Sequence, residues 1–253
     1  MYCYKLLLAY DGTYYGGWQV QPNAPSIQAH LQKAIQTFLN QELIRVIGSG
    51  RTDAGVHAVG QVAHFKSEQM IDLNRLRFSL NGLLPKDIRV KKIDHVLPSF
   101  HSQYSAIGKE YHYHLYLDPV MDPFRRLYCW HVLRRLDLEL LQQAATLFVG
   151  THDFTSFANE SHLGSAARNA VRTLYRLDMH PTQGGIRLEF EGDGFLYKMV
   201  RNIVGTLIDV ASLRKKIEEI QTIFAAKDRQ LASSAAPPQG LFLMRVDYPE
   251  EVR

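Results

Sequence analysis

The sequence contains little cysteine, no long apolar run and no large excess of charge of either sign. Its two cysteines, Cys3 and Cys129, lie outside any CxxC pattern, which excludes a disulfide framework and favours reduced thiols in a cytoplasmic protein. No apolar run approaches the roughly 18 residues that a membrane-crossing helix requires. The apolar segment at residues 4–10 is short and follows no basic leader, so it predicts a first strand and not a signal peptide.

The bulk composition is that of a folded protein. Of 253 residues, 46% are hydrophobic and 21% are charged, which excludes disorder and low-complexity fibres. This length predicts one or two domains, with enough buried surface to fold without a disulfide or metal. Lys and Arg number 29 against 25 Asp and Glu, giving a net charge of +4. That balance permits a polyanionic partner but does not require one, because only clustered charge creates a strong local field.

The spacing of apolar residues predicts a mixed α+β fold. Compact or alternating apolar runs predict strands, and apolar positions three and four apart predict helices. The expected strands are 4–10, 61–65, 88–93, 109–117, 171–179, 186–190 and 241–246, and the expected helices are 27–38, 73–83, 138–148, 195–210 and 213–226. Because strands and helices do not alternate strictly, we expect a largely antiparallel sheet.

The most unusual segment is GSGRTDAGVH at residues 48–57. Its glycines allow the backbone to approach another molecule closely. The segment precedes a strand and not a helix, which excludes a phosphate-binding loop, and its glycine spacing does not fit a dinucleotide-binding loop. Asp53 is either a turn residue or a catalytic carboxylate, and Arg51 would help to keep it ionised. Spacing alone leaves both interpretations open.

A second unusual loop, YDGTYYGGWQ at residues 10–19, combines aromatic side chains, glycines and an amide. Aromatic rings in such a loop can stack on unpaired bases, and amides can bind base edges. The alternative is that Tyr15 and Trp18 fill the core beside the turn. The spacing does not decide between these two roles.

Two further segments carry polar side chains of interest. Along the expected strand 109–114, Tyr111 shares one face with Tyr113, whereas His112 and His114 lie on the other face. The two histidines could bind a metal, but no HExxH pattern or suitably spaced third ligand accompanies them, so we expect them to line the wetter face of a sheet.

Basic and amide side chains occur at helical spacing on the expected helix 195–210. Lys198, Arg201 and Asn202 lie on one side of it and predict a solvated face. If Arg201 instead leans inward, it needs a carboxylate partner, for which Asp53 is a candidate.

Four segments occur in a fixed order: YDGT with GWQ within residues 10–19, GRTDAGVHA at 50–58, DFTSF at 153–157 and MVRNIVG at 199–205. Together they resemble the motifs of the TruA-type tRNA pseudouridine synthases, and the resemblance covers nearly the whole chain. It implies an isomerase that converts uridine to pseudouridine at tRNA positions 38 to 40, in the anticodon stem-loop, without a cofactor or metal.

The resemblance also implies the architecture. It predicts a cytoplasmic homodimer, outside any membrane, whose chain folds into two similar domains. Each domain is expected to have a mixed, largely antiparallel sheet with helices on one face, and the active-site cleft is expected between them. We place the domains at residues 1–104, with the aspartate loop, and 105–253, with the tyrosine strand and the MVRNIVG helix.

The resemblance assigns roles to individual residues. Asp53 would be the catalytic aspartate, and Tyr111 would stack on the target base and assist a proton transfer. Arg201 would pair with Asp53, and Arg51 would hold the flipped nucleotide open. Either Leu241 or Leu243 would pack on the base, and we take Leu243.

Two rival functions are weighed against this one. A tRNA-binding module without catalysis predicts decay of the aspartate loop, and a nucleoside hydrolase predicts a second carboxylate linked to Asp53. Neither feature is found in the sequence. The segment 160–168 resembles the family only loosely. The resemblance therefore does not predict RNA contacts in this segment, whereas the predicted reaction does not depend on it.

Overall fold

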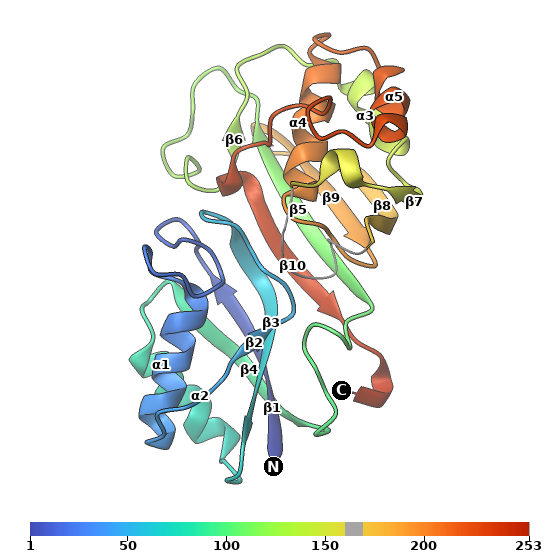
Figure 1. The fold of residues 1–253 in the computed structure, drawn as a ribbon. Helices are drawn as coiled ribbons and strands as arrows, with labels where there is room; N and C mark the ends of the chain where they lie inside the picture. Colours follow the sequence, from blue (N-terminus) through green and yellow to red (C-terminus); the bar gives the residue numbers. More distant parts are fainter. Residues whose placement is uncertain (160–168, 253) are drawn as a thin grey trace. The chain divides into compact units, whose positions relative to one another are not determined.

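A computed structural model describes residues 1–159 and 169–252 (Figure 1). The loosely matching segment 160–168 lies outside them. Contacts divide the chain into a first unit, Met1–Gly108 with Phe242–Arg253, and a second unit, Lys109–Leu241. The expected domain boundary after residue 104 lies close to the first of these divisions. Residues 242–252, which the sequence assigns to the second domain, instead group with the first unit.

The first unit is a sheet with two helices. Its strands are β1 (Tyr2–Tyr10), β2 (Ile47–Gly48), β3 (His57–Ser67), β4 (Ile88–Val96) and most of β10 (Leu241–Asp247), and its helices are α1 (Ile27–Leu39) and α2 (Leu73–Leu83). The strand order is β4-β1-β3-β10, with β2 paired to β3. Ser26 and Asp72 cap the two helices, each accepting a hydrogen bond from a first-turn backbone N–H. These caps and the apolar spacing explain why both helices begin where the sequence predicts.

The last strand of the chain belongs to the first unit by its pairing. In β10, Phe242 lies opposite His57 and Leu243 opposite Ala58, parallel to β3. The rings of Phe242 and His57 stack with centroids 4.5 Å apart. The strand therefore covers the start of β3, which directly follows the GRTDAGV loop.

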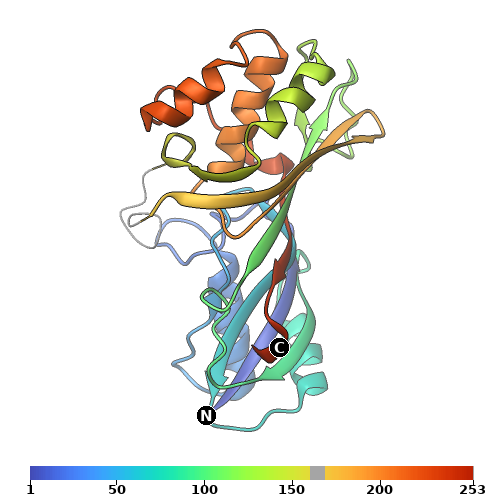
Figure 2. The same ribbon diagram turned by 90° about the vertical axis from the view of Figure 1, so that its right-hand side faces the viewer.

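The second unit also combines a sheet with helices. Its strands are β5 (Gly108–Tyr116), β6 (Trp130–His131), β7 (Gly150–Asp153), β8 (Val171–Thr182) and β9 (Gly185–Gly192); its helices are α3 (Leu138–Thr146), α4 (Met199–Ala211) and α5 (Glu219–Ala226). The strand order is β5-β9-β8-β7, with β6 paired to β5. Figure 2 shows the three helices on one side of these strands. Phe224 of α5 packs against Phe148, Phe154 and Phe157, and the last of these also contacts the other two.

Two helices begin later than the sequence predicts. We expected a helix from residue 195, but α4 begins at Met199, because Lys198 has a left-handed backbone with φ of 59°. We expected the next helix from residue 213, but Leu213 has φ of 61° and α5 begins only at Glu219. Left-handed backbone in a residue other than glycine interrupts a helix, and apolar spacing does not reveal it.

The α+β class and the largely antiparallel sheet are confirmed. Among the described strands, β3 with β10 and β5 with β6 are parallel. The antiparallel pairs are β1–β3, β1–β4, β2–β3, β5–β9, β7–β8 and β8–β9. Within the described residues, every helix is too short or too polar to cross a bilayer.

Candidate active site

The GRTDAGV loop connects β2 to β3 in the first unit. Arg51 is exposed, Asp53 is partly exposed, and Thr52 between them is buried. The backbone N–H of Val56 donates to the carbonyl of Asp53 at 3.1 Å, which closes a tight turn around the aspartate. The carboxylate thus lies on a short, constrained loop that leads into a buried strand.

The second unusual loop, residues 10–19, packs directly against this turn. The Trp18 N–H donates to the carbonyl of Thr52 at 3.0 Å, and the Gly55 N–H donates to the carbonyl of Tyr15 at 3.3 Å. Gly17 has φ of +100°, and a Cβ there would lie 2.4 Å from the Thr52 carbonyl oxygen. Only glycine allows such an approach without strain, so the two motifs form one structural element.

The aromatic residues of that loop mainly fill the core. Trp18 is 3% exposed and packs on Tyr10, with ring centroids 6.2 Å apart. Tyr15 is also buried, and its hydroxyl donates to Asp87 Oδ1 at 2.6 Å. The core interpretation is therefore right for both residues, whereas Tyr14 is exposed.

A buried network of hydrogen bonds holds residues 49–52, which directly precede the aspartate. Gln61 on β3 accepts from the Ser49 hydroxyl at 2.7 Å and donates to the Gly50 carbonyl at 3.0 Å. Gln61 also donates to the Tyr10 hydroxyl at 3.3 Å. The Tyr10 hydroxyl in turn lies 2.9 Å from Thr52 Oγ1. Burial raises the pKa of Tyr10 to about 12, so the phenol stays protonated. The sequence alone did not predict this network, because its members come from three separate segments. The one feature that could have indicated it is a glutamine within an otherwise apolar strand.

Leu243 lies in the same unit as Asp53. It is 1% exposed, and its partner in the β3–β10 pairing is Ala58, within the GRTDAGVHA motif. Leu241, the alternative from the sequence, falls in the second unit.

The second unit carries the remaining candidates. Tyr111 on β5 is 8% exposed, lies opposite Phe190 of β9, and packs edge-to-face on Phe195 with centroids 5.1 Å apart. These contacts hold the ring in one orientation. Its neighbour on the same face, Tyr113, donates from its hydroxyl to the Pro237 carbonyl at 2.7 Å.

Arg201 lies in the first turn of α4 and is partly buried. Its Nε donates to the Ala236 carbonyl at 2.7 Å, and the Ala236 N–H donates to the Arg201 carbonyl at 2.9 Å. Burial raises the pKa of Tyr113, and the Arg201 guanidinium acts against that rise. Asp53 and Arg201 belong to different units, and their pairing stays a prediction.

The rest of the MVRNIVG motif has structural roles. Asn202 is fully buried, and its amide donates to the Phe157 carbonyl at 2.8 Å, which links α4 to the DFTSF segment. A Cβ at Gly205 would lie 2.0 Å from the Ser234 carbonyl oxygen. Only glycine at this position therefore lets the backbone at Ser234 pack directly on α4. The expected solvated face is therefore wrong for Asn202.

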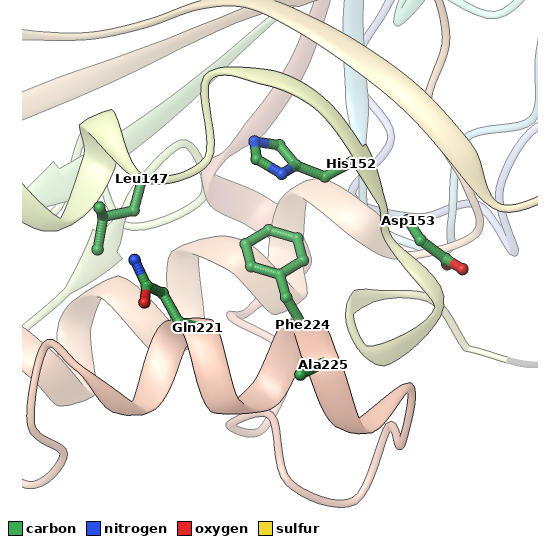
Figure 3. Close-up of a pocket in the computed structure, with 6 residues that line it drawn as sticks. All are labelled: Leu147, His152, Asp153, Gln221, Phe224 and Ala225. Carbon is green, nitrogen blue, oxygen red and sulfur yellow. The ribbon is translucent and has the colours of Figure 1, made fainter.

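An open cavity of about 360 Å³ lies elsewhere in the second unit (Figure 3). Its lining residues are Leu147, His152, Asp153, Gln221, Phe224 and Ala225. The rings of His152 and Phe224 stack at 4.8 Å, and Asp153 pairs with Lys227 at 2.7 Å. None of these six residues is among the candidates above.

Comparison with known proteins identifies the family. A family described as tRNA pseudouridine synthase matches residues 7–105 and 144–249. The chain is 66% identical over 251 residues to tRNA pseudouridine synthase A 1 of Protochlamydia amoebophila, covering 99% of this chain and 98% of that protein. It is 47% identical to the synthase A of Chlamydia muridarum, covering 96% and 91%, and 43% identical to that of a Geobacillus species, covering 96% and 97%.

The chain therefore belongs to the tRNA pseudouridine synthase family, and its class is isomerase. This confirms the resemblance found in the sequence. The motifs that carried it are the two loops, the DFTSF segment and the α4 segment.

Proposed function

We propose that this isomerase converts uridine to pseudouridine at positions 38 to 40 of the tRNA anticodon stem-loop, with Asp53 as its catalytic group. The observation that carries this proposal is the placement of Asp53 on a loop held by the 10–19 motif and the Gln61 network. In the reaction the C1′–N1 bond breaks, the uracil turns, and C5 bonds to C1′. The proton that leaves C5 is balanced by the one that N1 gains.

One carboxylate suffices for this chemistry. No water enters the product, so the second carboxylate of a glycoside hydrolase is not needed. Asp53 can serve either by attacking the sugar carbon or by removing a ribose proton. The inactive binding module, our alternative from the sequence, is not favoured, because the loop and its supporting contacts are intact.

We assign the other candidates to the flipped nucleotide. A base within a stem must leave its stack before it can react, and stacking on an aromatic ring returns about 1–3 kcal/mol. Tyr111 supplies that ring, Leu243 packs on the base, and Arg51 holds the nucleotide open. Arg201 pairs with Asp53 and keeps it ionised.

The proposed assembly is a cytoplasmic homodimer. Two chains of net charge +4 would carry about +8, which favours a polyanionic substrate. Light scattering of the purified protein tests the dimer independently of activity.

Site-by-site mapping of pseudouridine tests the substrate. Unmodified tRNA transcripts are incubated with the protein and mapped by carbodiimide chemistry. We expect pseudouridine at positions 38 to 40 wherever uridine occurs there. Pseudouridine at other positions would contradict the site assignment alone, whereas no pseudouridine in any transcript would contradict the function.

The polar network predicts a separable effect on rate and stability. Tyr10→Phe removes the hydroxyl that contacts Thr52 and Gln61, so we expect a loss of about 1–2 kcal/mol in unfolding free energy. We also expect kcat to fall about tenfold, because the aspartate loop loses a support. The control is Tyr4→Phe on the same strand, whose hydroxyl contacts Gln69 and Ile71. It should lose similar stability but keep kcat, and equal kcat in both variants would contradict the role of the network.

A further inference from the structure

An exposed aromatic side chain lies in the segment that follows β4 in the first unit. Tyr104 is 78% exposed, and one face of its ring stacks on His101, with ring centroids 4.3 Å apart and an angle of 26° between the planes. At this exposure the side chain adds little to the core. The opposite face of the ring is therefore open to a ligand.

A tight turn holds the two rings together. His101 Nδ1 accepts from the backbone N–H groups of Gln103 and Tyr104, both at 3.2 Å. The His101 N–H donates to Ser105 Oγ at 3.1 Å, and the Ser105 N–H donates back to the His101 carbonyl at 2.9 Å. Because the imidazole both closes the turn and supports the phenol ring, that ring is ordered before any ligand binds, which lowers the entropic cost of binding.

Buried contacts anchor this turn to the sheet of the first unit. Ser102 is fully buried; its N–H donates to His64 Nδ1 at 3.1 Å, and its hydroxyl donates to the Ile47 carbonyl at 2.8 Å. The Tyr248 hydroxyl donates to the Ser102 carbonyl at 2.6 Å. The turn is thus fixed by β2, by β3 and by the residue that follows β10.

Two exposed cations lie on the segments that hold the turn. Lys66 is on β3, and its Nζ donates to the Pro98 carbonyl at 2.8 Å, three residues before His101. Arg45 directly precedes the start of β2 by two residues. Burial lowers the pKa of His101, and the charges of Lys66 and Arg45 lower it further, so the imidazole is neutral at physiological pH. The positive charge here therefore comes from the two long side chains.

An open aromatic face with cations beside it suits an unpaired nucleotide. A base of any kind can stack on the ring, and lysine or arginine pairs with the phosphates. The centre of a protein–protein interface, by contrast, is depleted of charged residues. The charges of Lys66 and Arg45 therefore favour RNA over a protein as the ligand of this surface.

We propose that Tyr104 stacks on an unpaired nucleotide of the tRNA substrate and that Lys66 and Arg45 bind the adjoining phosphates. The ligand rests on the proposed function, but the surface contributes to binding and not to the isomerisation. The stacked nucleotide differs from the target uridine, which we assign to Tyr111.

Binding of an unmodified tRNA transcript to the full chain tests this surface. By filter binding, Tyr104→Ala should raise Kd about tenfold, whereas Tyr104→Phe keeps the ring and should stay within about twofold of wild type. Phe78→Ala, which removes an 84% exposed ring from α2 of the same unit, is the matched control and should bind like wild type. At saturating tRNA, Tyr104→Ala should reach the wild-type kcat, because the lost contact affects KM alone.

The salt dependence of Kd tests the two cations. Each phosphate contact contributes about 0.7 to 0.9 to the slope of log Kd against log salt concentration, so the double variant Arg45→Gln/Lys66→Gln should lower that slope by about 1.5. Lys33→Gln/Arg75→Gln removes two exposed cations from α1 and α2 and should leave the slope unchanged.

Three results would overturn the proposal. The first is that Tyr104→Ala binds tRNA as tightly as the Phe78→Ala control, and the second is that Tyr104→Phe loses as much affinity as the alanine variant. The third is that Tyr104→Ala binds tRNA normally but has a lower mass by light scattering, since the ring would then contact a second chain. Because Kd is measured without turnover, a wild type that binds tRNA but forms no pseudouridine would contradict the proposed function alone.

Discussion

Replacement of Asp53 by asparagine is expected to abolish pseudouridine formation, with a fall in kcat/KM of at least about 10³-fold. Asparagine keeps the size of the side chain but can neither attack carbon nor take a proton. The turn around residue 53 is closed by the backbone bond from Val56 to its carbonyl, which the substitution leaves in place. We therefore expect tRNA affinity within about threefold of wild type.

The measurement pairs single-turnover conversion of a tRNA transcript with filter binding of the same transcript. Asp94→Asn is the matched control, because it removes a partly buried carboxylate of the same unit that pairs with Lys5 and Lys92. That variant should convert tRNA at the wild-type rate. Normal conversion by the Asp53 variant would refute its catalytic role, and a parallel loss of affinity would make Asp53 a binding residue.

Replacement of Tyr111 by phenylalanine is expected to lower kcat about 10²-fold, with normal folding. The ring and its edge-to-face contact with Phe195 remain, so base stacking and KM should change little. What is lost is the hydroxyl, to which we assign the proton transfer. Single-turnover rates and the thermal unfolding midpoint measure the two effects separately.

Tyr113→Phe provides the matched control for this variant. Tyr113 lies on the same face of β5, but its hydroxyl donates to the Pro237 carbonyl. Its loss should cost about 1 kcal/mol of unfolding free energy and leave the rate unchanged. A wild-type rate for Tyr111→Phe would show that the ring alone serves the reaction.

The parts of the fold that depend on local signals could be predicted from the sequence. Helix α1 begins after Ser26 and α2 after Asp72, where caps and apolar spacing agree. The start of α4 could not be predicted, because the left-handed backbone of Lys198 depends on how the preceding loop packs. A local pattern contains no information about that packing.

The site divides in the same way. The family resemblance identified Asp53 and Tyr111 as candidates. It could not show that Gly17 packs against the aspartate loop, because the loops 10–19 and 48–57 meet only in the folded chain. For the same reason the polar partners of the strand 109–114 could not be predicted. Glu189 faces His112 through strand register, which no spacing along one segment reveals.

The pairing of β10 with β3 has a consequence for synthesis. Phe242 covers His57, yet the ribosome makes it only after the entire second unit. The sheet beside the aspartate loop thus stays unfinished while nearly the whole chain emerges. Contacts between residues so far apart in sequence form slowly, and an unpaired strand edge promotes aggregation meanwhile. A nascent chain that stalls before residue 242 would consequently carry every residue of the GRTDAGV loop without the strand that closes its flank.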